Sequence, residues 1–276
     1  MQATPDPQPA SHEALLNQSM DVVRAAIRAG DYTRHTAGLG RGRLQCNLVI
    51  LPASDADAFK GFCQANAQAC PLVGVSEPGV PHIPALGKTI DLRTDVPRYN
   101  IYRDGVQDGQ VFDLLDLWQD DWVVFALGCS FTFERALIEA GIAMRHVEQD
   151  RTVPMYVTSK PTVSSGPFGG TLVVSMRPIK LGDVETVKEI SGRYPLAHGA
   201  PVQIGDPSQL GIADLDAPNW GDRIDVLDGE VPVFWACGVT PQVAIRTARP
   251  AICVTHAPGS MLITDLDEFH AAAAAA

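Results

Sequence analysis

Three apolar segments of this 276-residue chain each end in a chemically reactive side chain within a few residues of a glycine or proline. Cys129, Cys237 and His256 stand where the three segments are expected to stop as strands. In open α/β sheets, ligands bind in the crevice beyond the carboxyl ends of the strands. Two thiols and one imidazole at such an edge therefore predict a reaction site rather than a core.

Helices and strands alternate in the first part of the chain. The apolar spacing predicts a helix over 12–29, a buried strand over 44–51, a helix over 55–68 and a short strand over 72–75. This order predicts an α/β fold with a mainly parallel sheet and helices on both of its faces. The same alternation returns over 201–266.

A β-rich stretch interrupts the alternation and predicts a second, smaller unit. We expect an α/β domain made of residues 1–113 and 181–270, with residues 114–180 forming an embedded α+β lobe. Residues 271–276 are six alanines and form a low-complexity tail.

Composition excludes several classes of partner. The net charge of −11 argues against nucleic acid and against anionic membranes, since both are bound through lysine and arginine. No apolar run approaches the roughly 20 residues of a membrane helix, and the polar first 13 residues do not resemble a signal peptide. The six cysteines form no C-x-x-C pair, which favours reduced thiols. We expect a cytoplasmic protein that acts on a small molecule.

Both candidate thiols precede a predicted helix. Thr240-Pro241 is typical of a helix start just after Cys237, and Cys129 precedes the helix that contains Glu134. The partial positive charge of a helix N-terminus lowers the pKa of a nearby thiol. We expect Cys129 to be the more reactive, with Glu134 as its proton partner. The alternative is that both thiols are small apolar residues of the core.

Two histidines are candidates for proton transfer. His256 ends a strand, and His198 lies among small residues that let a ligand approach closely. Either imidazole could equally be a buried group bonded to the backbone. No pair of His or Cys has the short spacing of the usual zinc motifs.

An acidic substrate needs a cationic anchor, and the segment Asp91 to Tyr99 offers two arginines. Arg93 and Arg98 could each hold a carboxylate through a bidentate fork, or form surface ion pairs that contribute little. Asp206 places a carboxylate at the end of another strand, and Asn47 shares one strand face with Gln45.

Nine segments together resemble the bacterial hydro-lyases of uncharacterised function (DUF1445), whose module also occurs in D-glutamate cyclase. They are TAGLGRG at 36–42, NLVILP at 47–52, DLRTDVPRY at 91–99, GCSFTFE at 128–134, VPMY at 153–156, VVSMRP at 173–178, HGAPVQIGDP at 198–207, VPVFWACGVTPQ at 231–242 and THAPGSMLITD at 255–265. They span the chain from about residue 20 to 267. Cys46 stands where the resemblance leads us to expect a small residue without a thiol, which makes it a weak catalytic candidate.

The resemblance implies a lyase that eliminates water from a small acidic substrate. For D-glutamate, the amine would attack its own side-chain carboxyl and close 5-oxo-D-proline. Such a reaction needs a general base, a proton for the leaving oxygen, donors for the oxyanion and a cation for the spare carboxylate. The expected catalytic residues are Cys129, Cys237, His256, His198 and Glu134, and the expected substrate-binding residues are Arg93, Arg98, Ser130, Gly238, Thr240 and Asp206.

Two other functions stay open. Cys129 and Cys237 could be the acid and base of a cofactor-free amino-acid racemase or epimerase, and a noncatalytic binding protein would hold a small acid without turnover. We lean to a backbone-amide role for Gly238, so that Cys237→Ala would keep much of the rate. The sequence shows no cofactor motif, and it leaves open both a divalent metal and a homo-oligomer.

Overall fold

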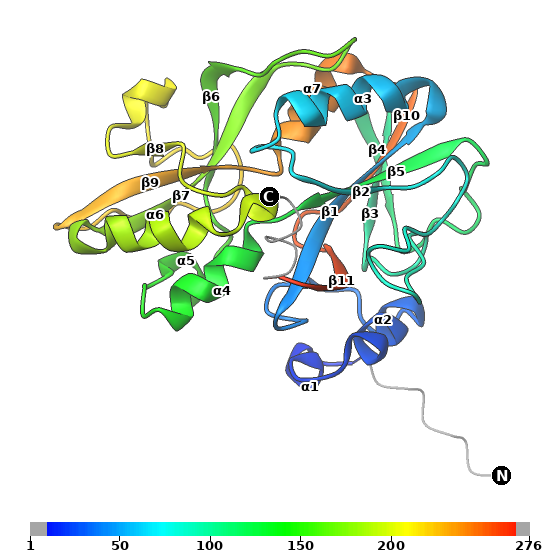
Figure 1. Ribbon diagram of the computed structural model, residues 1–276, viewed down its shortest axis with the longest axis horizontal. Coiled ribbons are helices and arrows are strands. Elements are labelled where there is room, and N and C mark those ends of the chain that lie inside the picture. The colour runs from blue at the N-terminus through cyan, green and yellow to red at the C-terminus, as the bar shows by residue number, and fades with distance from the viewer. Residues whose placement is uncertain (1–9, 269–276) are drawn as a thin grey trace.

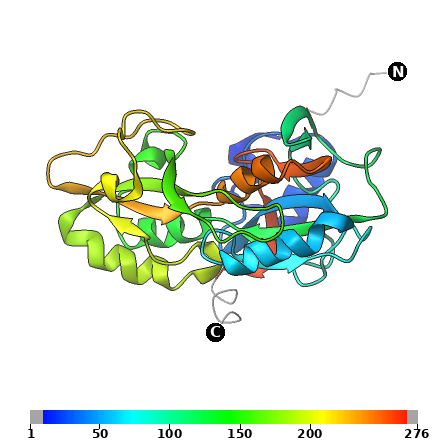
Figure 2. The same cartoon turned by 90° about the horizontal axis from the view of Figure 1, so that it is seen from above.

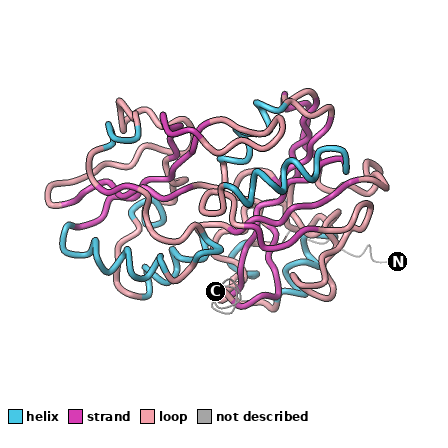
Figure 3. Tube along the Cα trace, turned by 45° about the horizontal axis from the view of Figure 1, so that its top comes forward, coloured by secondary structure: helices cyan, strands magenta, loops and turns pink. Residues whose placement is uncertain are grey.

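A computed structural model describes residues 10–268, which form two lobes, each built on one β-sheet (Figures 1 and 2). The polyalanine stretch at 271–276 lies outside these residues. Figure 3 shows how much of the chain between the helices and strands is loop. Within the described part, no helix has the length and apolar character needed to cross a membrane.

The first sheet has seven strands in the order β2-β5-β1-β10-β3-β4, with β11 paired to the other end of β1. Its strands are β1 (Arg43–Pro52), β2 (Leu72–Val75), β3 (Tyr99–Arg103), β4 (Val106–Val111), β5 (Trp122–Gly128), β10 (Ile252–His256) and β11 (Leu262–Asp267). The second sheet has the order β6-β7-β9-β8. Its strands are β6 (Met155–Pro161), β7 (Thr171–Lys180), β8 (Gln203–Ile204) and β9 (Glu230–Ala236).

Every strand pair of the two sheets is antiparallel, so the expectation of a mainly parallel sheet is wrong. The β1-α3-β2 order does give two strands that run in the same direction. However, β5 enters between them and pairs with both, antiparallel to each. The local pattern reports a strand's direction but not a partner that lies some 50 residues further along the chain, which is why the parallel sheet was predicted.

Helices cover one face of the first sheet. α3 (Ala53–Ala65) and α7 (Thr240–Ala248) pack on the face that contains Val49, Phe125 and Cys253. The opposite face is covered mainly by the loops between β2 and β3 and between β4 and β5, through apolar side chains such as Leu86 and Leu114. The predicted helices on both faces are therefore present on one face only.

The second sheet also has two covered faces. α4 (Phe131–Glu139) and α6 (Val184–Gly192) pack against Val233 and Trp235 of β9. The short helix α5 (Arg145–Glu148) and the 3₁₀ turns η1 (Leu181–Asp183) and η2 (Pro195–Ala197) lie near these helices, and η3 (Pro207–Leu210) contributes to the opposite face.

The strands divide between the lobes differently from the predicted boundaries at 114 and 180. β5 lies in the first sheet although it falls within 114–180, and β8 and β9 lie in the second sheet although they follow residue 181. The chain enters the second lobe after β5 and returns after β9. The hairpin loop between β6 and β7 reaches back across the junction, where Phe168 packs edge-on against Phe59 of α3.

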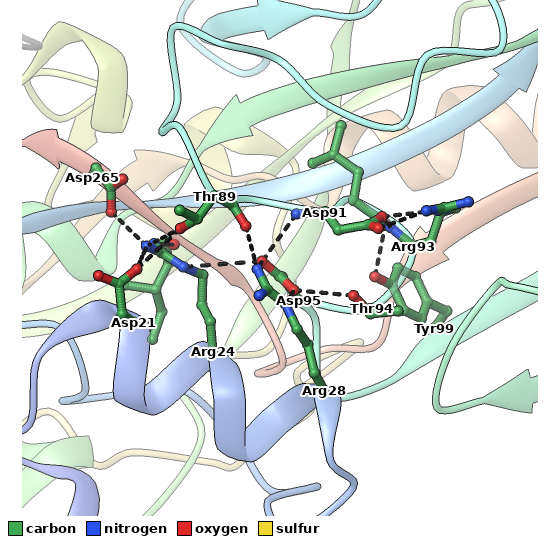
Figure 4. Close-up of polar contacts among 12 residues, drawn as sticks. Asp21, Arg24, Arg28, Thr89, Asp91, Arg93, Thr94, Asp95, Tyr99 and Asp265 are labelled. Atoms are coloured by element: carbon green, nitrogen blue, oxygen red, sulfur yellow. Dashed lines mark hydrogen bonds and ion pairs between the residues drawn. The ribbon is translucent and has the colours of Figure 1, made fainter.

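The predicted N-terminal helix is two helices, α1 (His12–Leu15) and α2 (Met20–Arg28). Ser11 caps the first through a bond from the Ala14 amide, and Ser19 stands at the start of the second. Arginines of α2 reach into the loop before β3 (Figure 4). Arg24 pairs with Asp265, and Arg28 holds Asp95, a carboxylate with no exposed surface. This network fastens α2 to the first sheet.

Candidate active site

Two thiols lie where the chain passes between the lobes. Cys129 directly follows β5, and Cys237 directly follows β9. The backbone amide of Phe131 donates to the Cys129 thiol, and that of Val239 donates to the Cys237 thiol. The two sulfur atoms are close enough to interact electrostatically. Each thiol therefore stands at the start of a helix, α4 or α7, as the sequence predicts.

Asn47 of β1 contacts both thiol turns, which are residues 128–130 after β5 and residues 237–240 after β9. Its side-chain Nδ2 donates to the carbonyl of Gly128 at 3.1 Å. A Cβ atom built on Gly238 would lie 2.5 Å from the same nitrogen, so any side chain there would displace Asn47 from its place against Gly128. The first sheet thus supplies a polar side chain that contacts both thiol turns and is only 7% exposed.

The thiols are protonated at neutral pH, contrary to the expectation from helix starts. Burial raises the pKa of Cys129 to about 12 and that of Cys237 to about 11, and the amide bonds and the charge of Arg177 offset only part of this rise. Cys129 is half-buried and Cys237 is buried. Cys129 is thus the more accessible thiol, and both can donate a proton.

A buried ion pair lies beside the thiols. Arg177 Nε donates to Glu134 Oε1 at 2.9 Å, and Nη2 contacts the same oxygen. His146 Nε2 lies 3.2 Å from the same oxygen. Burial alone would raise the pKa of Glu134, but the charges and hydrogen bonds of these two partners outweigh it and hold the pKa at about 2. Glu134 is therefore ionised and occupied, and it does not exchange protons with Cys129 near neutral pH.

Arg177 and His146 were missed as site residues by the sequence analysis. Arg177 lies in the segment VVSMRP, where one arginine follows an apolar run that becomes β7, and it is only 1% exposed. A buried arginine needs a carboxylate partner, so the charge inside this strand was the signal that could have led to Arg177. His146 lies in a polar segment with no comparable signal.

His198 has a neutral imidazole with one ring nitrogen free to accept a proton. Its Nδ1 lies 2.9 Å from the carbonyl of Gln68, which only accepts, so Nδ1 carries the proton and Nε2 has a free lone pair. Among the described residues, Nε2 has no hydrogen-bond partner. Burial and the charge of Arg177 lower the pKa of His198 to about 4, which keeps the ring neutral. His198 also has a φ of +76°, a strained conformation for a residue other than glycine.

The predicted role of His256 receives less support. Its Nδ1 lies against the backbone of Leu48, which it neighbours across β1 and β10. Burial lowers its pKa to about 4. Within residues 10–268, no hydrogen bond or ion pair joins it to either thiol. The contacts of His256 are those of a histidine inside the first sheet.

The predicted anion anchors are already occupied. Both Nε and Nη2 of Arg93 bond Asp91, at 2.9 and 2.8 Å (Figure 4). Arg98 donates to the carbonyl of Thr33 at 3.1 Å and lies over the ring of Phe112. Neither arginine has a contact with the thiol turns among the described residues.

The remaining predicted site residues have structural contacts. Thr240 does not cap α7, because its hydroxyl accepts from the Val173 amide at 3.1 Å. Asp206 is exposed and begins η3 by accepting from the amide of Ser208. Cys46 is buried in β1, and burial together with the nearby Cys129 raises its pKa. In the described range, no group of three or more His, Cys, Asp or Glu side chains is arranged to hold a metal ion.

The two buried histidines make stability depend on pH. Their pKa of about 4 in the folded protein lies below the ordinary 6.5, so the unfolded chain binds more protons between these values. Stability is then complete above pH 6.5 and falls as the pH drops. From pH 7.5 to 5 we expect a loss of about 2 kcal/mol for each histidine.

Urea unfolding midpoints at the two pH values check this expectation. His198→Gln and His256→Gln should each weaken the pH dependence, whereas the exposed His82→Gln should leave it unchanged. A dependence equally steep in all three variants would contradict it.

The molecule is an α/β protein whose two sheets bring together two protonated thiols and free backbone amides at helix starts, beside a buried ion pair whose arginine also acts on a neutral imidazole, His198. A family model described as D-glutamate cyclase matches residues 123–265, the part that carries both thiol turns. The chain belongs to the D-glutamate cyclase family.

Curated relatives cover nearly the whole chain. A protein from Dinoroseobacter shibae is 58% identical over 257 residues, which are 93% of this chain and 86% of the relative. One from a Jannaschia species is 58% identical over 246 residues, or 89% and 92% of the two chains. Both carry the name "Putative hydro-lyase". A solved structure of a nitrogen repressor-like protein from Methanococcus jannaschii is 12% identical with a TM-score of 0.37, over 76% of this chain and 80% of that one, a likeness too small to support an argument.

Proposed function

We propose that this protein is a hydro-lyase that closes D-glutamate, or a closely related small acidic amino acid, into its lactam with loss of water. The observation that carries the proposal is that two protonated thiols at two helix starts, one of them half-buried, and a neutral imidazole all interact with the charge of the same buried arginine, Arg177. Membership of the D-glutamate cyclase family supports the choice of substrate.

The proposed reaction moves two protons from nitrogen to oxygen. The α-ammonium group loses both, its nitrogen bonds to the side-chain carboxyl carbon, and one carboxyl oxygen leaves with them as water. Cys129 hands each proton to the departing oxygen, and His198 Nε2 takes each from the nitrogen and returns it to the thiolate. At neutral pH the Cys129 thiol rests protonated and the His198 imidazole rests neutral, which are the forms that the first step needs.

Backbone amides would stabilise the tetrahedral oxyanion. The N–H groups of Ser130 and Gly238 have no acceptor within residues 10–268, and each lies just before a helix. Helix starts favour negative charge, and preorganised donors in a water-poor site are worth more than in water. In this mechanism Cys237 contributes its backbone turn rather than its sulfur.

The matched placement of the thiols also favours a second candidate function. In a racemase or epimerase, one thiol takes the Cα proton and the other delivers a proton to the opposite face. Both sulfurs accept an amide at a helix start in the same way, which would serve two equivalent acid–base groups. This mechanism requires both thiols, whereas the cyclisation requires only one.

Incubation with D- and L-glutamate in D₂O, followed by mass spectrometry, tests both functions. We expect 5-oxo-D-proline from D-glutamate. Cys129→Ala should reduce the rate by about 10³-fold, the scale of general acid catalysis, and Cys237→Ala by less than about tenfold, because alanine keeps the N–H. Cys253→Ala, at a buried cysteine in the core of the first lobe, is the control and should retain the rate.

The other outcomes decide against cyclisation. Deuterium at Cα without loss of water, abolished by either Cys129→Ala or Cys237→Ala, would identify a racemase. Binding of glutamate without any change in mass would identify a noncatalytic binding protein.

A further inference from the structure

The guanidinium of Arg177 is fully enclosed and its donors are directed at three side chains. Besides Glu134, Nη1 donates to Ser175 Oγ at 3.0 Å and Nη2 donates to Ser130 Oγ at 3.2 Å. The side chain is 1% exposed. A guanidinium has donors and no acceptor, so each bond also fixes the orientation of its partner.

Two aromatic rings hold Arg177 in place. Its central carbon lies 5.1 Å from the ring centroids of both Phe133 and Trp235, which are themselves stacked 5.4 Å apart. Phe133 follows Cys129 by four residues, and Trp235 precedes Cys237 by two. Arg177 therefore contacts both segments that carry the thiols, from a third element, β7.

The bond to Ser130 has a directional consequence. Ser130 stands at the start of α4 but makes no capping bond with its side chain. Its oxygen accepts from Arg177 instead, and because Arg177 cannot accept, the hydroxyl proton must point elsewhere. Ser130 is 8% exposed and adjoins the half-buried Cys129, so this proton can be offered to a ligand beside the thiol.

We propose that Arg177 is the positioning residue of this site: it aims the Ser130 hydroxyl at the substrate oxyanion and fixes the Cys129 turn against the Cys237 turn. This inference rests on the proposed function, since it assigns the oxyanion donor of that reaction. Arg177 touches no reacting atom and acts through Ser130 and the thiol turns.

The charges around Cys129 affect its pKa, so they give a measurable effect of Arg177 that a purely structural role would not produce. Arg177 lowers the pKa of Cys129, whereas Glu134 and Cys237 raise it. Cys46 also faces Cys129 from β1. Removal of the positive and of the negative member of the ion pair should therefore shift the reactivity of Cys129 in opposite directions.

The first measurement is the rate of Cys129 alkylation by iodoacetamide as a function of pH, read at that residue by peptide mass spectrometry. We expect Arg177→Met to slow alkylation at pH 8 and Glu134→Gln to accelerate it, by about tenfold for each unit of pKa shift. Arg145→Met is the matched control, since Arg145 forms a similar pair with Glu230 on another part of the second lobe and should leave the rate unchanged. Unchanged alkylation in Glu134→Gln would overturn the electrostatic part even if Arg177→Met fails to fold.

The second measurement tests the positioning through turnover. Arg177→Lys keeps the charge but loses the planar fork, so we expect near-normal alkylation with kcat lowered about 10²-fold, the scale of a lost oxyanion donor. Ser130→Ala should lower kcat by a similar factor, and the double variant should lose no more than either single one. If the loss of kcat in the double variant equalled the product of the two single losses, the two residues would act independently and the proposal would be overturned. Alkylation needs no substrate. Absence of glutamate turnover in the wild type would therefore reject the proposed function together with the oxyanion role of Ser130, whereas the first measurement would still decide whether Arg177 sets the reactivity of Cys129.

Discussion

Gly128→Ala is expected to lower the free energy of unfolding by at least about 3 kcal/mol, at the upper end of what overpacking costs. A Cβ built at this position would lie 1.5 Å from the backbone carbonyl oxygen of Leu196. The obstacle is main chain, which has no rotamer to change. Gly128 also pairs with Cys46 at the end of β5, so the strand has little freedom to move away.

Gly182→Ala is the matched control. Gly182 lies in η1 with nothing within 4 Å of its built Cβ and no strained backbone. Alanine there should stabilise the fold slightly, by about 0.4–1 kcal/mol, because it restricts the unfolded chain. Urea unfolding of the two variants measures the contrast, and similar midpoints would show that the Leu196 contact relaxes easily.

Asp95→Ala is expected to cost about 3 kcal/mol, the scale of removing one partner of a buried ion pair. The Asp95 carboxylate accepts from Arg28 at 2.6 Å, from the Asp91 amide at 3.1 Å and from the Thr94 hydroxyl at 3.1 Å (Figure 4). It has no exposed surface, and Arg24 of α2 lies 4.0 Å away. Without it, Arg28 loses the carboxylate that holds it, and Arg24 loses one of its three carboxylate partners.

Asp21→Ala tests whether the stabilisation by this network depends on the burial of the carboxylate or only on the number of charges. Asp21 also pairs with Arg24, at 3.0 Å, but its side chain is 75% exposed. Thermal unfolding should show its midpoint close to that of the wild type, because exposed pairs contribute little. Equal losses for Asp95→Ala and Asp21→Ala would mean that the network acts through its total charge rather than through the buried contacts.

The thiol turns could be predicted from sequence because the signal is local. An apolar run, a cysteine and a helix start within about ten residues require no knowledge of the rest of the fold, and the helices after Cys129 and Cys237 are present. The state of the thiols could not be predicted the same way. Helix starts lower a thiol pKa, but burial raises it and dominates here, and burial depends on how segments distant in the sequence pack around the thiols.

The roles of Arg93 and Arg177 could not be predicted from sequence because the ion-pair partner of an arginine is not visible there. Arg93 was predicted to anchor a substrate, yet its fork is filled by Asp91, two residues away. Arg177 lies 43 residues from Glu134 in sequence, so the bond between them becomes visible only when α4 packs against β7. The same distance in sequence explains the sheet: no local pattern indicates that β5 pairs between β1 and β2.

Within the described residues, the backbone crosses between the two sheets at two places, and a cysteine follows the last strand at each. Both covalent bridges of the molecule therefore run through its proposed reaction centre. A rotation of one lobe relative to the other would change the backbone at residues 128–130 and 237–240, and with it the separation of the two sulfurs. A ligand that contacts both turns would hold the two lobes in one relative orientation, so that ligand binding and lobe orientation would be coupled.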